Sequence, residues 1–233
     1  MMNSLLEIAK ISHSGDRSTK PLCYYKKYDD FISHHKLVPT SILEVGVYAG
    51  ESTKILSKTF PNAKIVAVDL QLQPIDFSEY PNVVYLQADQ TDQKGLQQII
   101  QTHFPEGVDL VIEDACHYGW HSKTTFDIVF PFVKDGGAYF VEDWGTGYWN
   151  FFPDGNTYNG TSIISDQHNK TRIVSHDYGM VGFVKSLVDM THESAIINEP
   201  NSDIAFQTIE TYTSRIRVLE FGEGVCMLVK GRN

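Results

Sequence analysis

With 233 residues and 42% hydrophobic content, the chain is long enough to bury a substantial core and falls within the usual size of one globular domain. Its formal net charge of −10 at pH 7, from 19 basic and 29 acidic residues, argues against unspecific binding to nucleic acid or to anionic lipid as the main activity. Since no apolar run is long enough to cross a bilayer and the first residues lack a signal-peptide pattern, we expect a cytoplasmic protein that acts on a small molecule.

The first forty residues differ from the rest of the chain. We expect residues 1–40 to form an N-terminal helical segment, and residues 41–233 to form one domain. Aromatic residues at positions 24, 25, 28 and 31 have the spacing of one face of a short helix. This helix either caps the active site or packs onto the domain, and packing is the favoured interpretation for each tyrosine.

From residue 41 onward, apolar strands alternate with amphipathic helices, which indicates a parallel sheet covered on both faces. The predicted strands cover 41–47, 64–69, 83–88, 108–113 and 138–141, and the predicted helices cover 50–60, 92–103, 120–132 and roughly 176–190. Gly136 and Gly137 are expected to break the chain before the fifth strand. Residues 143–169 are expected to form a long ordered loop over the active site.

The end of the chain predicts a hairpin, with β-rich runs at 215–221 and 225–230 joined by three residues that include two glycines. The expected fold is therefore α/β: a doubly wound, Rossmann-like, seven-stranded sheet that is mostly parallel and ends in an antiparallel hairpin. A dehydrogenase domain that binds nicotinamide more usually ends in another parallel unit, so the hairpin counts against that class.

A glycine-containing turn follows the first predicted strand. Gly46 and Gly50 would let the backbone approach a ligand at the carboxyl end of that strand. Asp69 ends the second strand, 25 residues after Glu44, and Asp89 follows the third. Carboxylates at these positions suit the ribose and the adenine of an adenosine. The alternatives are that the glycines serve the turn alone and that Asp69 and Asp89 are ordinary loop carboxylates.

Acidic residues also follow the fourth and fifth strands. Asp114 lies in the segment Glu-Asp-Ala-Cys-His at 113–117, and Glu142 and Asp143 precede Trp144. Because these strands are neighbours in the expected order, the three carboxylates should meet at one rim of the sheet and require a cation. Oxygen ligands favour a hard ion, and Mg²⁺ is our first choice among divalent cations. The alternative is that one or two of them cap helices, as Asp114 would before residues 118–120.

His117 is the candidate general base. It lies three residues after Asp114, close enough to take a proton from a hydroxyl held at the metal. His117 and His121 are four residues apart on an expected helix, and two such histidines either bind a transition metal together or, more often, share a solvated helix face.

Together, the segments 113–117 and 141–149 resemble the catalytic motifs of the metal-dependent sugar O-methyltransferases that act on macrolide antibiotics, the mycinamicin and macrocin enzymes. The resemblance covers roughly 41–149 and the terminal hairpin, and differs where that family has Asp-Asp-Gly-Ser-His in place of Glu-Asp-Ala-Cys-His. It implies a class I methyltransferase with His117 as the catalytic base and a metal bound by Asp114, Glu142 and Asp143. The implied residues for S-adenosyl-L-methionine are Glu44, Gly46, Tyr48, Gly50, Ser52, Asp69, Asp89, Gln90 and Asp114.

The expected reaction is metal-assisted transfer of a methyl group from S-adenosyl-L-methionine to a hydroxyl of a small molecule, such as a sugar-bearing natural product. A homo-oligomer is compatible with this reading. Two alternatives stay open: an iron-dependent oxygenase that resembles the cephalosporin hydroxylases, and a protein that binds S-adenosyl-L-methionine without catalysis.

Overall fold

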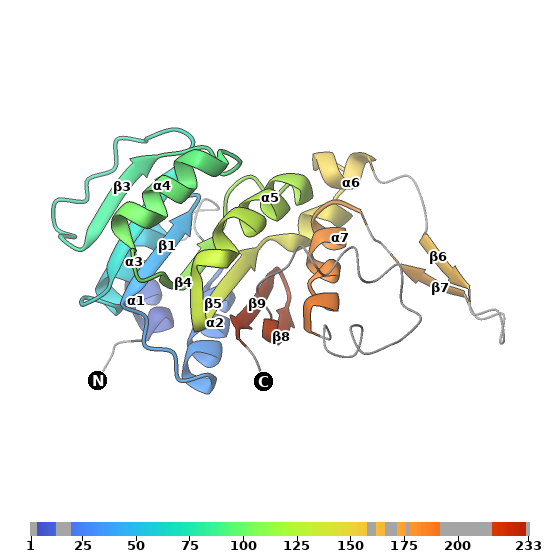
Figure 1. Cartoon of the computed structure of the whole chain (residues 1–233), viewed down its shortest axis with the longest axis horizontal. Coiled ribbons are helices and arrows are strands. Elements are labelled where there is room, and N and C mark those ends of the chain that lie inside the picture. The colour runs from blue at the N-terminus through green and yellow to red at the C-terminus, as the bar shows by residue number, and fades with distance from the viewer. Residues whose placement is uncertain are drawn as a thin grey trace.

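The computed structural model describes residues 4–12, 20–157, 162–165, 172–175, 178–191 and 216–231. Seven strands form the main sheet in the order β3-β2-β1-β4-β5-β9-β8, and two more form a separate pair (Figure 1). The main-sheet strands are β1 (Ser41–Val45), β2 (Lys64–Asp69), β3 (Val83–Gln87), β4 (Val108–Glu113), β5 (Val133–Glu142), β8 (Ile216–Gly222) and β9 (Val225–Lys230). The first five are mutually parallel, whereas β9 runs antiparallel to β5 and to β8. The predicted fold class and the terminal hairpin are confirmed.

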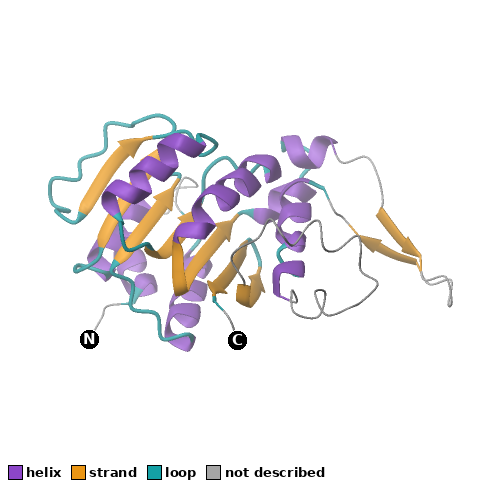
Figure 2. Ribbon diagram, viewed as in Figure 1, coloured by secondary structure: helices purple, strands orange, loops and turns teal. Residues whose placement is uncertain are grey.

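Helices cover both faces of the sheet, coloured purple over orange strands in Figure 2. One core cluster joins the sheet to α4 (Gln93–His103), α5 (Gly119–Val129) and α7 (Gly179–Ser186), and the other joins it to α1 (Leu5–Ser12), α2 (Leu22–His34) and α3 (Glu51–Thr59). The two clusters take alternate residues of the same strands, as the pleat of a sheet requires. The strands are apolar almost throughout because both of their faces are buried.

Helix α2 packs against the sheet through the aromatic face that the sequence predicts. Tyr24, Tyr25, Tyr28 and Phe31 are all buried, and the Tyr28 ring lies 4.8 Å from the ring of Phe140 in β5, centroid to centroid. The first turn of α1 is tied to α2, since the carboxylate of Asp29 accepts hydrogen bonds from two backbone N–H groups of α1. Among the described residues, no helix has the length and apolar character needed to span a membrane.

The prediction for β5 is wrong at its start. The strand begins at Val133 and includes Gly136 and Gly137 instead of starting after them. Its pairing with β4 shifts register between Val108 and Leu110. A Cβ on Gly137 would lie 2.9 Å from the carbonyl oxygen of Asp109, so this glycine accommodates the irregular pairing and does not end the strand.

The region predicted as one loop at 143–169 contains regular structure. A 3-10 helix η2 (Trp144–Tyr148) follows β5 directly, and α6 (Pro153–Thr157) and β6 (Ser162–Ser165) come after it. β6 pairs antiparallel with β7 (Arg172–Ser175). The predicted helix near 176–190 is divided into α7 and a 3-10 helix η3 (Asp189–Thr191). The other parts of these two predictions, 158–161, 166–169 and 176–177, lie outside the described residues.

Candidate active site

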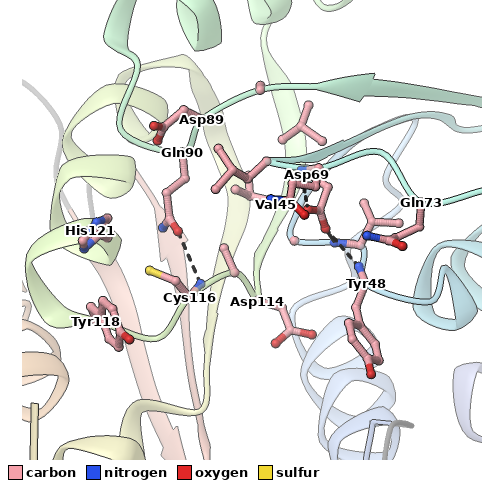
Figure 3. Close-up of a pocket in the computed structure, with 17 residues that line it drawn as sticks. Val45, Tyr48, Asp69, Gln73, Asp89, Gln90, Asp114, Cys116, Tyr118 and His121 are labelled. Carbon is pink, nitrogen blue, oxygen red and sulfur yellow. Dashed lines mark hydrogen bonds between the residues drawn. The ribbon is translucent and has the colours of Figure 1, made fainter. Parts of the chain in front are cut away.

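A cavity of about 520 Å³ opens at the carboxyl ends of β1, β2, β3 and β4 (Figure 3). Six of the residues predicted to bind the cofactor line it: Gly46, Tyr48, Asp69, Asp89, Gln90 and Asp114. Its size lies within the range typical of small-molecule sites, and it lies at the edge of the sheet where doubly wound folds bind ligands.

Asp69 shapes the wall of this cavity at the end of β2. One of its carboxylate oxygens accepts hydrogen bonds from the backbone N–H groups of Val47 and Tyr48, at 2.8 and 3.0 Å (dashed in Figure 3). The neighbouring turn requires glycine, because Gly46 has φ +94° and a Cβ there would lie 2.1 Å from the carbonyl oxygen of Asp114. The β1 loop therefore packs directly against the β4 loop.

Asp89 and Gln90 lie on the opposite side of the cavity and differ in the hydrogen bonds that their side chains make within the protein. An Asp89 carboxylate oxygen accepts hydrogen bonds from the backbone N–H and the hydroxyl of Thr91, and the backbone bond is the main reason that the pKa of Asp89 lies below its usual value. The Gln90 amide bonds to the Cys116 N–H and to the Thr125 hydroxyl. Gln90 thus ties the β4 loop to α5, and the carboxylate of Asp89 is the more accessible group.

Three of the predicted cofactor residues lie outside the lining. Glu44 is fully buried and accepts a hydrogen bond from the hydroxyl of Thr53. Gly50 is the N-cap of α3, with φ +76°, and a Cβ there would lie 2.8 Å from the side chain of Ile75. Ser52 lies in the first turn of the same helix. These residues support the loop from behind and do not face the cavity.

A second cavity, of about 850 Å³, adjoins the first. Lys20, Tyr24, Glu142, Asp143 and Trp144 line it, among others. Tyr48, Asp114 and Ala115 line both cavities. A ligand in the first cavity and a ligand in the second would therefore meet at the Asp114 loop.

Asp114, His117 and Asp143 converge beside this boundary. The His117 Nε2 lies 3.7 Å from an oxygen of Asp114 and 3.6 Å from an oxygen of Asp143, and one ligand atom from each residue lies within 4.8 Å of the other two. All three side chains are only partly exposed. The two carboxylates supply oxygen ligands of the kind that Mg²⁺ prefers and lie close enough together to share one cation, with the imidazole beside them. These residues therefore fit the predicted metal.

Glu142 lies apart from that group. Its side chain is 1% exposed, and one of its oxygens accepts hydrogen bonds from the Lys20 ammonium and the Tyr28 hydroxyl. Lys20 also lies 3.2 Å from an Asp114 oxygen. Burial alone would lower the pKa of Lys20, but the carboxylates of Glu142 and Asp114 raise it well above its ordinary value, so the side chain is a cation.

Asp143 is held by α2. The hydroxyl of Tyr24 donates a 2.5 Å hydrogen bond to one Asp143 oxygen, and the other oxygen faces His117. Burial and this bond raise the pKa of Tyr24, so the phenol keeps its proton. Gly224 in the β8–β9 turn makes room for the contact, because a Cβ there would lie 1.8 Å from the Tyr24 hydroxyl.

Two alternatives for the β4 loop are wrong. His117 has φ +55° and precedes α5, so it does not share a helix face with His121, which lines the first cavity. Asp114 does not cap α5, because the N–H of Gly119 donates to the carboxylate of Asp154. With one histidine and two carboxylates, the cluster also differs from the two histidines and one carboxylate that are usual in iron oxygenases.

Sequence reasoning missed Lys20 and assigned no polar contact to Tyr24 or Tyr28. Lys20 is the last residue of a polar stretch that shows no helix or strand periodicity. Its partner Glu142 lies 122 positions further along the chain, so no local pattern connects the two. The spacing of the aromatic residues predicted that α2 packs on the sheet. No local signal showed that the hydroxyls of Tyr24 and Tyr28 donate hydrogen bonds to Asp143 and Glu142.

The family model described as FtsJ-like methyltransferase matches residues 24–130. The sheet order is that of the Rossmann-like fold of these methyltransferases. The MycE methyltransferase from the mycinamycin biosynthetic pathway, solved in complex with Mg and SAH, superposes with a TM-score of 0.69 and 23% identity, over 100% of this chain and 56% of that one.

Among curated proteins, the chain is similar to the macrolide sugar O-methyltransferases. It is 27% identical to mycinamicin VI 2''-O-methyltransferase of Micromonospora griseorubida over 88% of this chain and 47% of that protein. It is 28% identical to demethylmacrocin O-methyltransferase of Streptomyces fradiae over 70% of this chain and 38% of that protein. The chain thus spans less than half the length of these relatives. The resemblance that the motifs predicted is confirmed.

Proposed function

We propose that the protein transfers a methyl group from S-adenosyl-L-methionine to a hydroxyl of a small molecule, such as a sugar-bearing natural product, with the help of a divalent cation. One observation carries this proposal: two cavities share the Asp114 loop, and the carboxylates of Asp114 and Asp143, which lie close to His117, line the second cavity. The similarity to methyltransferases that act on sugar hydroxyls supports the choice of reaction.

The first cavity is the proposed cofactor site. Asp69 and Asp89 place carboxylates at the ends of neighbouring strands, where hydroxyl and amine donors of an adenosine can be bound. The Nδ1 of His121, on the same wall, is buried and has no hydrogen-bond partner among the described residues. A ligand with polar edges would satisfy it, and the same residues offer no cluster of cations for a pyrophosphate.

The second cavity is the proposed acceptor site. Asp114 and Asp143 would hold the cation, which when bound lowers the pKa of a neighbouring hydroxyl. His117 would accept the proton at Nε2, the nitrogen that faces both carboxylates. Tyr24 fixes Asp143 by donating to its other oxygen. Trp144, Tyr148 and Trp149 on the cavity wall provide apolar surface for the acceptor.

The test is transfer of labelled methyl from S-adenosyl-L-methionine to a panel of glycosylated and phenolic compounds, with Mg²⁺, with Mn²⁺ and with a chelator. We expect methylated products that vanish on chelation. The Asp143→Asn variant should lose the dependence on metal together with most of the turnover, because asparagine keeps the bond from Tyr24 but not the charge. Binding of S-adenosyl-L-methionine without transfer to any acceptor would favour the non-catalytic alternative, and turnover that needs ferrous iron and oxygen would favour an oxygenase.

A further inference from the structure

Lys20 is buried among the carboxylates that follow β4 and β5, here called the acidic cluster: Asp114, Glu142 and Asp143. Its side chain is 5% exposed, and its ammonium forms ion pairs with both Glu142 and Asp114. It also lies 5.6 Å from the ring centroid of Tyr28. A cation held by two carboxylates and an aromatic ring has lost most of its water, so it depends on these contacts to offset the cost of burial.

The position of Lys20 divides the predicted metal ligands into two groups. Asp143 and one oxygen of Asp114 face His117, whereas the other Asp114 oxygen and an oxygen of Glu142 face Lys20. The Glu142 oxygen bound to Lys20 also accepts the bond from Tyr28. Glu142 therefore already has its positive charge and its hydrogen-bond donors from the chain itself.

A divalent cation and Lys20 would repel each other across this cluster. Both are positive, and both are attracted by Asp114. The repulsion is strong because the interior of the cluster screens charge less than water does. Recruiting Glu142 to the metal would also take from the buried Lys20 ammonium the nearer of its two carboxylate partners, which is costly.

We propose that Lys20 is a positioning residue that withholds Glu142 from the divalent cation, so that the metal binds through Asp114 and Asp143 and more weakly than all three carboxylates would allow. This inference rests on the proposed metal-assisted function. It assigns to Lys20 control over metal affinity, a property separate from the methyl-transfer step.

The test is titration of the full chain with Mn²⁺, followed by the electron paramagnetic resonance signal of the free ion, without cofactor or acceptor. Lys20→Met should tighten Mn²⁺ binding about tenfold or more, because it removes a positive charge and releases Glu142. Lys20→Arg keeps the charge and should keep the affinity of the unmodified protein. Lys26→Met is the matched control, since Lys26 also pairs with a carboxylate, that of Asp30, but on the exposed surface of α2.

The double variant Lys20→Met with Glu142→Gln separates Glu142 from the rest of the cluster. It has the net charge of the unmodified protein, and its Mn²⁺ affinity should return to about that of the unmodified protein. Both variants are compared by circular dichroism, and the double variant also removes the charge that Lys20→Met leaves buried. Unchanged or weaker binding in Lys20→Met, or equally tight binding in the double variant, would overturn the proposal.

Absence of Mn²⁺ binding in both the unmodified protein and Lys20→Met would also overturn it. Calorimetric titration of the same preparations with S-adenosyl-L-methionine distinguishes this result from a failure of the proposed function. Cofactor binding without metal binding would leave methyl transfer open and remove only the metal and the role of Lys20.

Discussion

Four described residues other than glycine have left-handed backbone, and three of them line or border the candidate site: Tyr48, His117 and Asp143. This conformation is costly for residues with a Cβ and is less so for Asn, Asp and His. Each of the three follows a strand or the loop after it, and the side chains of Tyr48 and Asp143 line the second cavity. Local strain at these positions thus coincides with the proposed chemistry.

Two substitutions at His117 separate its chemistry from its conformation. Both His117→Asn and His117→Ala should lower turnover about 10²- to 10⁴-fold, the usual contribution of a positioned base. Only the alanine variant should also lose stability, by about 1 kcal/mol, because asparagine tolerates φ +55° and alanine does not. Turnover and thermal unfolding of the two variants check this. Normal turnover in His117→Asn would remove His117 from the base role.

Asp109 illustrates a carboxylate with a purely structural task. One of its oxygens accepts hydrogen bonds from both the N–H and the hydroxyl of Thr40 and of Ser41, and the other pairs with Lys134 at 2.8 Å. Burial raises its pKa, but these bonds outweigh burial and lower the pKa to about 2. Asp109 therefore fastens the start of β1 to β4 and β5.

The stability that Asp109 contributes should be fully present above pH ~4, the ordinary aspartate pKa, and lost as the pH falls through about 2. Asp109→Asn should lower the free energy of unfolding by about 1–3 kcal/mol at neutral pH. Urea unfolding of both proteins between pH 7 and pH 2.5 measures the difference, which should shrink toward the acidic end. A constant difference over that range would contradict the assignment.

At the scale of elements, the strands were predictable because their apolar runs are continuous and end sharply. The predicted bounds of the strands at Lys64–Asp69, Val108–Glu113 and Val225–Lys230 match the structure, and strand ends placed the two acidic segments at one rim. Residues 133–137 were misread, because glycines that permit irregular pairing look the same in sequence as glycines that end a strand. The Lys20–Glu142 pair was unpredictable, since no local pattern joins residues so far apart.

Gly224, in the β8–β9 turn, leaves room for the Tyr24 hydroxyl beside Asp143. Gly224→Ala should displace Tyr24 from Asp143 and weaken Mn²⁺ binding, in addition to the cost of alanine at φ +76°. Gly136→Ala is the control, since Gly136 has φ +82° but a Cβ there would have no described atom within 4 Å. Both variants should lose about 1 kcal/mol from backbone strain, and only Gly224→Ala should lose more and bind Mn²⁺ less tightly. Equal effects of the two substitutions on Mn²⁺ binding would refute a role for the Tyr24 contact.

For the whole molecule, a ligand that binds only the folded chain must stabilise it. S-adenosylhomocysteine at about 100 times its Kd should add about 2.7 kcal/mol, which for a domain of this size corresponds to a rise in Tm of roughly 5–10 °C. Differential scanning fluorimetry measures this rise, and Asp69→Asn should reduce it at the same ligand concentration. An unchanged Tm at saturating ligand would show that the folded chain does not bind the cofactor, and an equal rise in Asp69→Asn would place the cofactor away from Asp69.

Tyr48, Asp114 and Ala115 form a stretch of wall that the two cavities share. Any shift of this wall on binding one ligand is felt by the other, and thermodynamic reciprocity then requires equal effects in both directions. An acceptor that tightens cofactor binding by some factor must itself be bound tighter by that same factor when the cofactor is present. In the proposed reaction the spent cofactor and the product would both lie against these three residues.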